Sequence, residues 1–285
     1  MGVTVSGETR VAGVFGCPVS HSQSPAMHNA AFGQMGLDFV YVPFDVHPDN
    51  LEAAVGGIRA LNMVGVNVTI PHKERVIPFL DWVSEDALLI RSVNTIHYVD
   101  GQLRGYSTDG EGFIRALKTS GKDPTGSKAV VLGAGGSARA TAHALVTSGA
   151  EVTVANRTFG RAVELAELLR AFSIRPIALD SVDARKAIRE ADLLVNCTSV
   201  GMHPKADDQP IPSEWLHNGL FVYDQIYNPL ETRLLKAARS AGCQAANGVK
   251  MLVFQGAVSF ELWTGKTPPI EVMETAVLEG LRSRP

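Results

Sequence analysis

The sequence predicts an α/β protein of two domains, because β-type runs alternate with amphipathic helical patterns along most of its 285 residues. One β-type run leads into a glycine-rich turn and then a helix, which is typical of a Rossmann-like domain. The length also favours two domains, since an ordinary domain has roughly 150 residues. We therefore expect an N-terminal α/β domain followed by a Rossmann-like domain.

The expected strands are short and bounded by turn residues. They cover residues 11–15, 39–44, 64–70, 129–132, 151–155, 193–196 and 220–223. Helical patterns between them cover residues 48–61, 137–148 and 159–172, and two more, at residues 249–265 and 270–282, end the chain. This alternation implies parallel sheets. We expect the seam between the domains near residues 121–128, just before the glycine-rich turn.

Composition and charge exclude several kinds of partner. A net charge of −3, a pI near 6.2 and the lack of any Lys/Arg run argue against nucleic acid and anionic membranes. Cys17, Cys197 and Cys243 are odd in number and far apart, so we expect neither a disulfide framework nor a metal site. No signal-peptide pattern or apolar run of about 18 residues occurs. These features predict a soluble cytoplasmic protein that acts on a small molecule, as a monomer or a homodimer.

Residues 66–73, VNVTIPHK, join an alternating strand to a lysine. The apolar side chains of Val66, Val68 and Ile70 alternate with two polar ones, Asn67 and Thr69. In a pleated strand this alternation predicts one face that packs and one that meets something polar.

The residues after this strand predict a helix and a reactive amine. Pro71 suits the first position of a helix, which would put Lys73 in the first helical turn. The positive end of the helix dipole disfavours an ammonium there and favours the neutral amine. We therefore interpret Lys73 as a candidate proton shuttle.

A nucleotide site is predicted where a buried strand meets a glycine-rich turn, AVVLGAGGSARA. Glycines let the backbone approach a pyrophosphate, whose charge the helix N-terminus then holds. The second strand of the unit, EVTVAN, follows the helix as the motif requires. The candidate residues are Gly133, Ala134, Gly135, Gly136, Ser137 and Ala138.

The end of that second strand indicates which dinucleotide binds. An acidic residue there would hold the ribose of NAD, but this chain has Asn156, Arg157 and Thr158, with Arg161 one turn on. Arginines suit a 2′-phosphate, so NADP is preferred over NAD. A solvated helix start remains the alternative. Further along, Thr198 and Ser199 follow another buried strand and either meet the same ligand or are ordinary loop hydroxyls.

Two polar segments are candidates for substrate binding. In HSQSPAMHN, Ser24 is a good N-cap before a proline, and Ser22 adds a second hydroxyl at an anion-favouring helix end. The alternative is a plain cap. In a later segment Asn94 lies on an expected strand, and Asp109 stands inside a capping box, where it either serves catalysis or simply favours the helix dipole.

Together these segments resemble the shikimate dehydrogenases. The matching segments follow the family's order along nearly the whole chain: HSQSPAMHN, NVTIPHK, VNTI, STDGEG, LGAGGSARA, NRT, NCTSVGM, YDQIYNP and GVKMLVFQGAVSFELWTG. The resemblance implies NADPH-dependent reduction of 3-dehydroshikimate to shikimate in the pathway to chorismate and aromatic amino acids. It also implies a discontinuous substrate domain, residues 1–109 plus 249–285, and a Rossmann-like NADP-binding domain, residues 110–248.

The resemblance also implies roles for individual residues. Lys73 and Asp109 would form the catalytic pair. The substrate would be held by Ser22, Ser24, Asn67, Thr69, Asn94, Asp109, Tyr227 and Gln255. NADP would be held by Gly133, Ala134, Gly135, Gly136, Ser137, Ala138, Asn156, Arg157, Thr158, Arg161, Thr198, Ser199, Met202, Gly248 and Met251.

Three positions depart from the family pattern. Ser107 replaces the usual asparagine before the Thr-Asp pair, Arg91 stands in place of a small residue before VNTI, and Lys250 adds a positive charge. Two other functions stay open. One is an NAD-dependent quinate/shikimate dehydrogenase, which Arg157 and Arg161 disfavour. The other is a non-catalytic NADP-binding sensor, which Lys73 and Asp109 disfavour.

Overall fold

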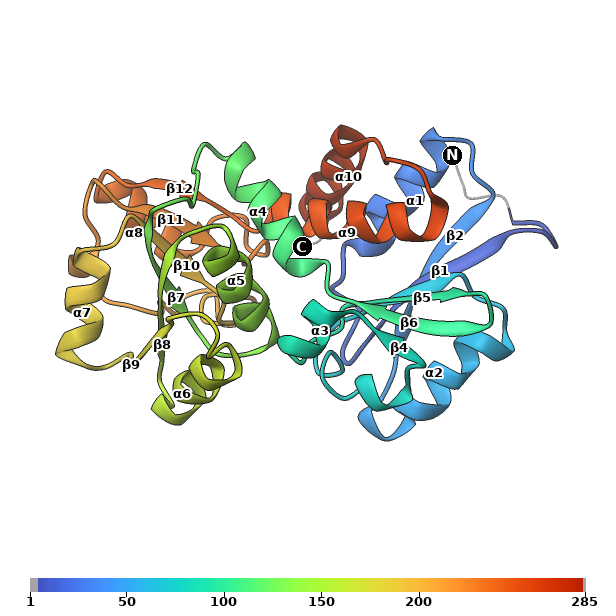
Figure 1. Ribbon diagram of the computed structural model, residues 1–285. Coiled ribbons are helices and arrows are strands. Elements are labelled where there is room, and N and C mark those ends of the chain that lie inside the picture. The colour runs from blue at the N-terminus through green and yellow to red at the C-terminus, as the bar shows by residue number, and fades with distance from the viewer. Residues whose placement is uncertain (1–4, 284–285) are drawn as a thin grey trace. The chain divides into compact units, whose positions relative to one another are not determined.

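The computed structural model describes residues 5–283, and the chain forms two compact units (Figure 1). The first unit runs up to Thr108 and resumes at Leu252, and the second unit is Asp109–Met251. The boundaries expected from the sequence, after residues 109 and 248, differ from these by one and three residues. Asp109 was expected in the first unit but belongs to the second. It is the first residue of helix α4 (Asp109–Thr119), which packs against α5 (Gly136–Thr147) of the second unit.

A six-stranded sheet in the order β2-β1-β3-β5-β6-β4 forms the centre of the first unit. Its strands are β1 (Arg10–Gly16), β2 (Phe39–Asp45), β3 (Gly65–Val68), β4 (Trp82–Val83), β5 (Thr95–Val99) and β6 (Gln102–Tyr106). β1 pairs in parallel with β2 and β3, whereas β5 pairs antiparallel with β3 and β6. The prediction of parallel sheets is therefore wrong for part of this sheet.

The antiparallel part follows from a tight turn between β5 and β6. Asp100 and Gly101 connect the two strands, with φ of 53° and 74°. Positive φ at both central residues is the geometry of a type I′ turn, which Asp-Gly favours and whose twist suits a hairpin. A two-residue connection can join only antiparallel neighbours.

Helices cover the sheet of the first unit. They are α1 (Ser24–Gln34), α2 (Leu51–Ala60), α3 (Glu85–Leu89), α9 (Val249–Thr264) and α10 (Ile270–Arg282), with short 3-10 turns η1 (Pro48–Asn50) and η2 (Ile77–Phe79). α10 lies beside α1 (Figure 1). An aliphatic cluster that includes Val66, Val68 and Ile96 packs under α2 residues such as Ile58.

The second unit has a parallel six-stranded sheet in the order β9-β8-β7-β10-β11-β12. Its strands are β7 (Lys128–Leu132), β8 (Glu151–Asn156), β9 (Arg175–Ala178), β10 (Leu193–Asn196), β11 (Phe221–Asp224) and β12 (Gln244–Ala246). The remaining helices are α6 (Phe159–Leu168), α7 (Val182–Arg189), α8 (Arg233–Ser240) and the 3-10 turn η3 (Ser213–Trp215). Numbered within the unit, this order is the 3-2-1-4-5-6 of the Rossmann fold, so the fold prediction is confirmed.

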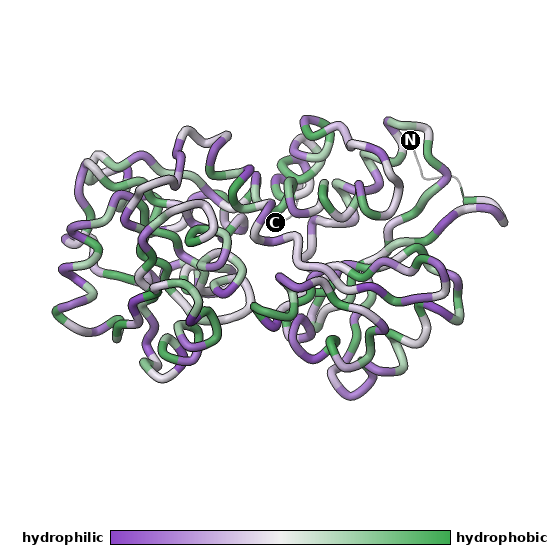
Figure 2. Tube along the Cα trace, in the orientation of Figure 1, coloured by the Kyte–Doolittle hydropathy of each residue, from purple (hydrophilic) through white to green (hydrophobic). Residues whose placement is uncertain are grey.

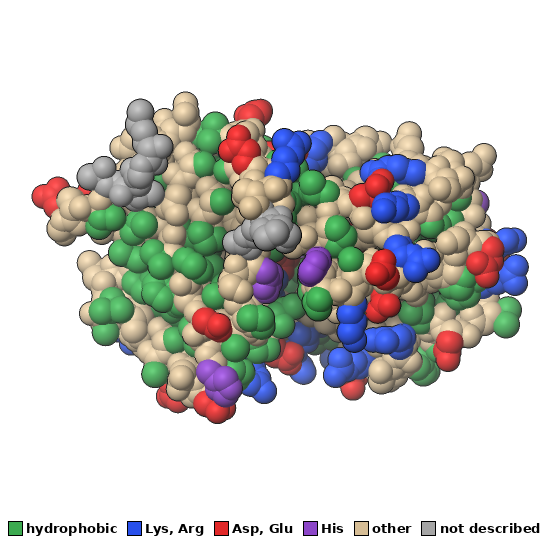
Figure 3. Space-filling view, turned by 180° about the vertical axis from the view of Figure 1, so that it is seen from behind, with side chains coloured by type: hydrophobic (Ala, Val, Ile, Leu, Met, Phe, Trp, Pro, Cys, Tyr) green, Lys and Arg blue, Asp and Glu red, His purple; other side chains and the backbone are tan. Residues whose placement is uncertain are grey.

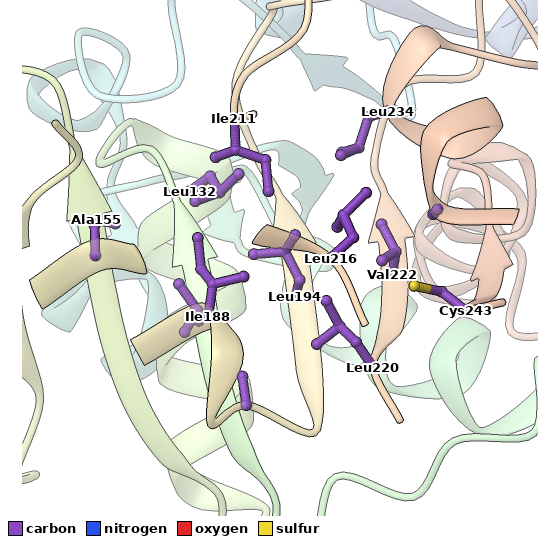
Figure 4. Packing of buried hydrophobic residues seen from close by; sticks show 14 of the residues in the cluster. Leu132, Ala155, Ile188, Leu194, Ile211, Leu216, Leu220, Val222, Leu234 and Cys243 are labelled. Carbon is purple, nitrogen blue, oxygen red and sulfur yellow. The ribbon is translucent and has the colours of Figure 1, made fainter. Parts of the chain in front are cut away.

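Burial explains why this sheet forms. Leu132, Leu194 and Val222 come from three neighbouring strands and pack with Ile188 of α7 and Leu234 of α8 (Figure 4). Hydrophobic stretches run through the interior of the unit (Figure 2). Strands buried on both faces read as continuous apolar runs, which is why the sequence pattern located them.

The helix expected after Pro71 does not form, so that prediction is wrong. Residues 73–76 are turns, and the first helical residues are those of η2. The N–H of His72 donates to Thr69 O at 2.8 Å, around a cis Ile70-Pro71 bond. Ile70 is 70% exposed and does not share the buried face of Val66 and Val68.

The charged side chains on the surface are of both signs, as expected from the small net charge of −3. On the face in Figure 3, Lys and Arg side chains are interspersed with Asp and Glu. Within residues 5–283 every helix is too short or too polar to cross a bilayer. In the same range, His, Cys, Asp and Glu side chains form no cluster of three or more suited to a metal ion.

Candidate active site

A buried network of amides and hydroxyls lies at the centre of the first unit. The amide Nδ2 of Asn67 is 2.9 Å from Ser259 Oγ, 3.0 Å from Thr95 Oγ1 and 3.1 Å from the Asn94 carbonyl oxygen. Because that carbonyl can only accept, the Asn67 amide must turn its nitrogen toward it. The polar side of β3 therefore faces a buried network.

Asn94, just before β5, ties Gln255 to the segment that precedes α4. Its Nδ2 donates to Thr108 Oγ1 at 2.8 Å and to Gln255 Oε1 at 3.2 Å, and its Oδ1 accepts from the Thr108 N–H at 2.7 Å. Gln255 Nε2 donates to Leu252 O at 2.8 Å. Three predicted substrate residues, Asn67, Asn94 and Gln255, are thus brought together in one unit.

The two candidate serines lie at the start of α1. Ser22 Oγ accepts from the Ser24 N–H at 3.2 Å, and Ser24 is itself the first helical residue. The residue at the N-cap is Gln23, which makes no side-chain cap, so the expectation that Ser24 is the cap is wrong. Ser24 is buried and Ser22 is half-buried.

Lys73 lies in the turn after β3 and is half-buried. Its carbonyl oxygen accepts from the Val93 N–H at 2.8 Å, which anchors this turn to the residues just before Asn94. Because no helix begins at Pro71, the helix N-terminus that was expected to act on the Lys73 amine is not formed there. Thr69, also half-buried, directly follows β3, and its N–H donates to Phe15 O at 2.9 Å.

In the second unit the glycine-rich turn has the geometry of a phosphate cradle. Gly133 has φ +105°, and a Cβ there would lie 3.2 Å from a Thr198 methyl group. Gly135 is the N-cap of α5, makes no side-chain cap, and faces open space. The N–H groups of the first turn of α5 are therefore not capped by a side chain and can receive an anion.

The predicted 2′-phosphate residues lie together where β8 ends and α6 begins. Arg157, Thr158 and Arg161 are exposed, and Asn156 Nδ2 donates to Thr158 O at 2.9 Å. Thr158 is the N-cap of α6 but gives it no side-chain bond. Two exposed arginines beside an uncapped helix start suit a phosphate group, so these residues fit NADP.

A hydrogen-bond chain supports the loops at the ends of β10 and β11. Asn196 Nδ2 donates to Asp224 Oδ1 at 3.0 Å, and Asn196 Oδ1 accepts from the Thr198 hydroxyl at 2.7 Å. The Thr232 hydroxyl donates to Asp224 Oδ2 at 2.7 Å. Burial raises the pKa of Asp224 to about 6, although these hydrogen bonds oppose the shift.

The other predicted cofactor residues lie near the same strand ends. Ser199 and Met202 are exposed in the loop after β10, and Met251 is buried in the first turn of α9. Gly248 directly precedes α9, and a Cβ there would lie 2.0 Å from Gln225 O, so a side chain at this position would collide with backbone. The Ser137 hydroxyl donates to Gln225 Oε1 at 2.6 Å.

The predicted site residues are divided between the two units. Asp109 and Tyr227 belong to the second unit with the nucleotide residues, whereas the others expected to hold the substrate belong to the first unit with Lys73. Sequence reasoning missed Tyr41, Thr95 and Ser259, which complete the buried network. One available signal was that Ser259 follows Gln255 by four residues on one helix face.

Comparison with known proteins identifies the family of the chain. Family models described as the shikimate dehydrogenase substrate binding domain, the shikimate / quinate 5-dehydrogenase and the shikimate 5'-dehydrogenase C-terminal domain match residues 14–96, 116–204 and 248–278. The shikimate dehydrogenase (NADP(+)) of Methanopyrus kandleri is 51% identical over 98% of this chain and 99% of its own. That of Moorella thermoacetica is 47% identical over 98% and 96%.

Solved structures give the same result. The Thermus thermophilus shikimate 5-dehydrogenase in complex with NADP(H) and shikimate superposes with a TM-score of 0.89, at 41% identity over 96% of this chain and 100% of that one. With relatives this similar over nearly the full length, the chain belongs to the shikimate dehydrogenase family.

Proposed function

We propose that this protein is an oxidoreductase that reduces 3-dehydroshikimate to shikimate with NADPH, reversibly, in the biosynthesis of chorismate and aromatic amino acids. The observation that carries the proposal is the buried network of Asn67, Asn94 and Gln255. A polyhydroxylated ring needs several hydrogen-bonding groups held in fixed orientations, and a closed network provides them.

Most residues of the proposed substrate site belong to the first unit, and Asp109 and Tyr227 belong to the second. The hydroxyls of Ser22 and Ser24, at the start of α1, hold the carboxylate, and Tyr227 assists them. The ring hydroxyls are held by Asn67, Thr69, Asn94, Asp109 and Gln255. Asn94 donates to Thr108 and Gln255 and accepts from the Thr108 N–H, and these bonds fix the orientation of its amide.

The second unit binds NADP through its own residues. The turn from Gly133 to Ala138 receives the pyrophosphate, and Asn156, Arg157, Thr158 and Arg161 take the 2′-phosphate. Thr198, Ser199, Met202, Gly248 and Met251 border the rest of the dinucleotide. When bound, NADPH supplies the hydride for the C3 carbonyl carbon of the substrate.

Lys73 and Asp109 manage the proton. Lys73 donates a proton to the oxygen that develops negative charge at C3, and Asp109 orients that hydroxyl. Positioned proton transfer of this kind contributes roughly 10² to 10⁴-fold to a rate. The main-chain bond from Val93 to Lys73 O keeps the lysine turn in register with Asn94.

One assay tests this function against its rivals. Purified protein is mixed with shikimate and NADP⁺, and NADPH absorbance is followed, with parallel reactions that contain NAD⁺ or quinate. We expect rapid turnover only with shikimate and NADP⁺. Preferred use of NAD⁺ and quinate would favour a quinate dehydrogenase, and no turnover with any pair would favour an NADP-binding sensor.

The same proposal includes the cellular compartment, the partners and the oligomeric state of the protein. The thiols of Cys17, Cys197 and Cys243 are free, which suits a reducing compartment such as the cytoplasm. We propose a cytoplasmic enzyme without nucleic-acid or membrane partners, working as a monomer or a homodimer. Light scattering after gel filtration distinguishes the two oligomeric states.

A further inference from the structure

Tyr41, on β2, connects two parts of the substrate site that are far apart in sequence. Its side chain is buried, and its hydroxyl donates to Asn67 Oδ1 at 2.7 Å. This hydrogen bond holds the polar residue of β3.

The backbone of Tyr41 is held by one side chain from α1. Asn29 Oδ1 accepts from the Tyr41 N–H at 2.8 Å, and Asn29 Nδ2 donates to Tyr41 O at 2.9 Å. These two hydrogen bonds to the side-chain amide of Asn29 fix β2 relative to α1. Asn29 is the last residue of the HSQSPAMHN segment, so this segment supplies both the serines and the clamp.

The ring of Tyr41 is held by aromatic neighbours. His28 stacks on it with ring centroids 4.4 Å apart and planes 10° apart, and Trp263 lies 6.0 Å away. Neither ring nitrogen of His28 has a hydrogen-bond partner within the described structure, and burial lowers its pKa to about 3. His28 is thus a neutral ring whose role here is packing. The Trp263 indole N–H donates to Ile96 O at 3.0 Å, which fixes that ring as well.

We propose that Tyr41 is a positioning residue that holds the hydroxyl-binding amide of Asn67 in place relative to α1, the helix that begins at the carboxylate-binding residue Ser24. The inference rests on the proposed function. A substrate with a carboxylate and a ring hydroxyl on one rigid ring meets both groups only when they keep a fixed separation. Tyr41 provides that separation because Asn29 of α1 clamps its main chain and its hydroxyl holds Asn67.

The test is Tyr41→Phe, which keeps the stacked ring and removes only the hydroxyl that binds Asn67. We expect the KM for shikimate to rise about tenfold, the usual consequence of losing one net hydrogen bond, while the KM for NADP⁺ stays at the wild-type value. The matched control is Tyr98→Phe, on β5 of the same sheet, where the ring packs at the edge of the aliphatic cluster. This control should leave both constants unchanged.

A merely structural role would give a different result. Tyr41→Phe would then lower the melting temperature and the apparent kcat without changing the KM for shikimate, and that outcome would overturn the proposal. Asn29→Asp gives a second measurement, because it keeps the acceptor for the Tyr41 N–H and loses the donor to Tyr41 O. We expect Asn29→Asp to raise the KM for shikimate, as Tyr41→Phe does. Wild-type protein that does not oxidise shikimate would refute the proposed function instead.

Discussion

Asn94 and Thr108 are joined by two hydrogen bonds, from Asn94 Nδ2 to Thr108 Oγ1 at 2.8 Å and from the Thr108 N–H to Asn94 Oδ1 at 2.7 Å. Thr108 directly precedes Asp109, the first residue of α4. The main chain that leads into the proposed catalytic carboxylate of Asp109 is therefore held by a side chain expected to bind substrate. This double contact also gives a physical reason why an amide is needed at position 94.

The first prediction concerns this pair. Asn94→Ala removes the acceptor for the Thr108 N–H and the donor to its hydroxyl, so Asp109 loses its support. We expect kcat to fall by about 10²-fold, because small misplacements of reacting groups have effects of that size. Stopped-flow measurement of hydride transfer would check this. An Asn94→Ala enzyme with wild-type kcat would mean that α4 holds Asp109 without help.

The second prediction concerns Lys73. Lys73→Ala should lower kcat by roughly 10² to 10⁴-fold, the range for a lost proton-transfer group. The affinity for NADP⁺, measured by fluorescence titration, should stay near wild type. The matched control is Lys266→Ala, an exposed lysine just after α9 that should leave kcat unchanged. Full turnover in Lys73→Ala would show that another group moves the proton.

The third prediction concerns the choice of cofactor. Arg157→Ala and Arg161→Ala should each raise the KM for NADP⁺ by about tenfold or more, since a charge-assisted hydrogen bond contributes about 1.5–3 kcal/mol. The KM for NAD⁺ should not increase, because NAD⁺ lacks the 2′-phosphate. Arg170→Ala, just beyond the other end of α6, is the control with a similar charge change. Equal losses with both cofactors would assign these arginines to folding.

The fourth prediction concerns pH and Asp224. Its pKa in the folded protein is about 6, raised above the ordinary value by burial. The folded state therefore binds a proton that the unfolded state has already lost between about pH 4 and pH 6. This contribution to stability is fully present below pH 4 and is lost as the pH rises through 6.

Asp224→Asn should remove this dependence. Relative to the variant, the free energy of unfolding of the wild type should fall by about 3 kcal/mol between pH 4 and pH 7, at about 1.4 kcal/mol per pH unit over the titrating range. Urea denaturation at several pH values measures it. Asp180→Asn, exposed in the turn after β9, should show no such trend. A wild-type curve parallel to that of Asp224→Asn would contradict the assignment.

Local patterns located most of the fold. The Rossmann strands β7, β10 and β11 were found because they are buried on both faces and read as nearly unbroken apolar runs. The short strands β9 and β12 were missed because they are only partly buried and contain no such run. The hairpin of β5 and β6 was also missed, although Asp100-Gly101 is a turn signal that the sequence contained.

The candidate site was predicted less completely. The helix expected after Pro71 does not form, because its backbone groups bond elsewhere: Lys73 O accepts from the distant Val93 N–H, and the His72 N–H closes a local turn on Thr69. Ser24 was expected as a cap because its hydroxyl suits that role, yet α1 begins at Ser24 itself and Gln23 occupies the N-cap. At Lys73 a partner distant in sequence decided the outcome.

The sequence by itself determined the fold class, the position of the nucleotide turn and the residue types of the substrate site, because these depend on periodicity, on glycine and on ordered motifs. Only the tertiary structure decided that Tyr41, Thr95 and Ser259 complete the buried network and that Asn94 supports the residue before Asp109. The physical reason is that a buried polar group must find a partner in space. Nothing in local spacing shows which residue will be there.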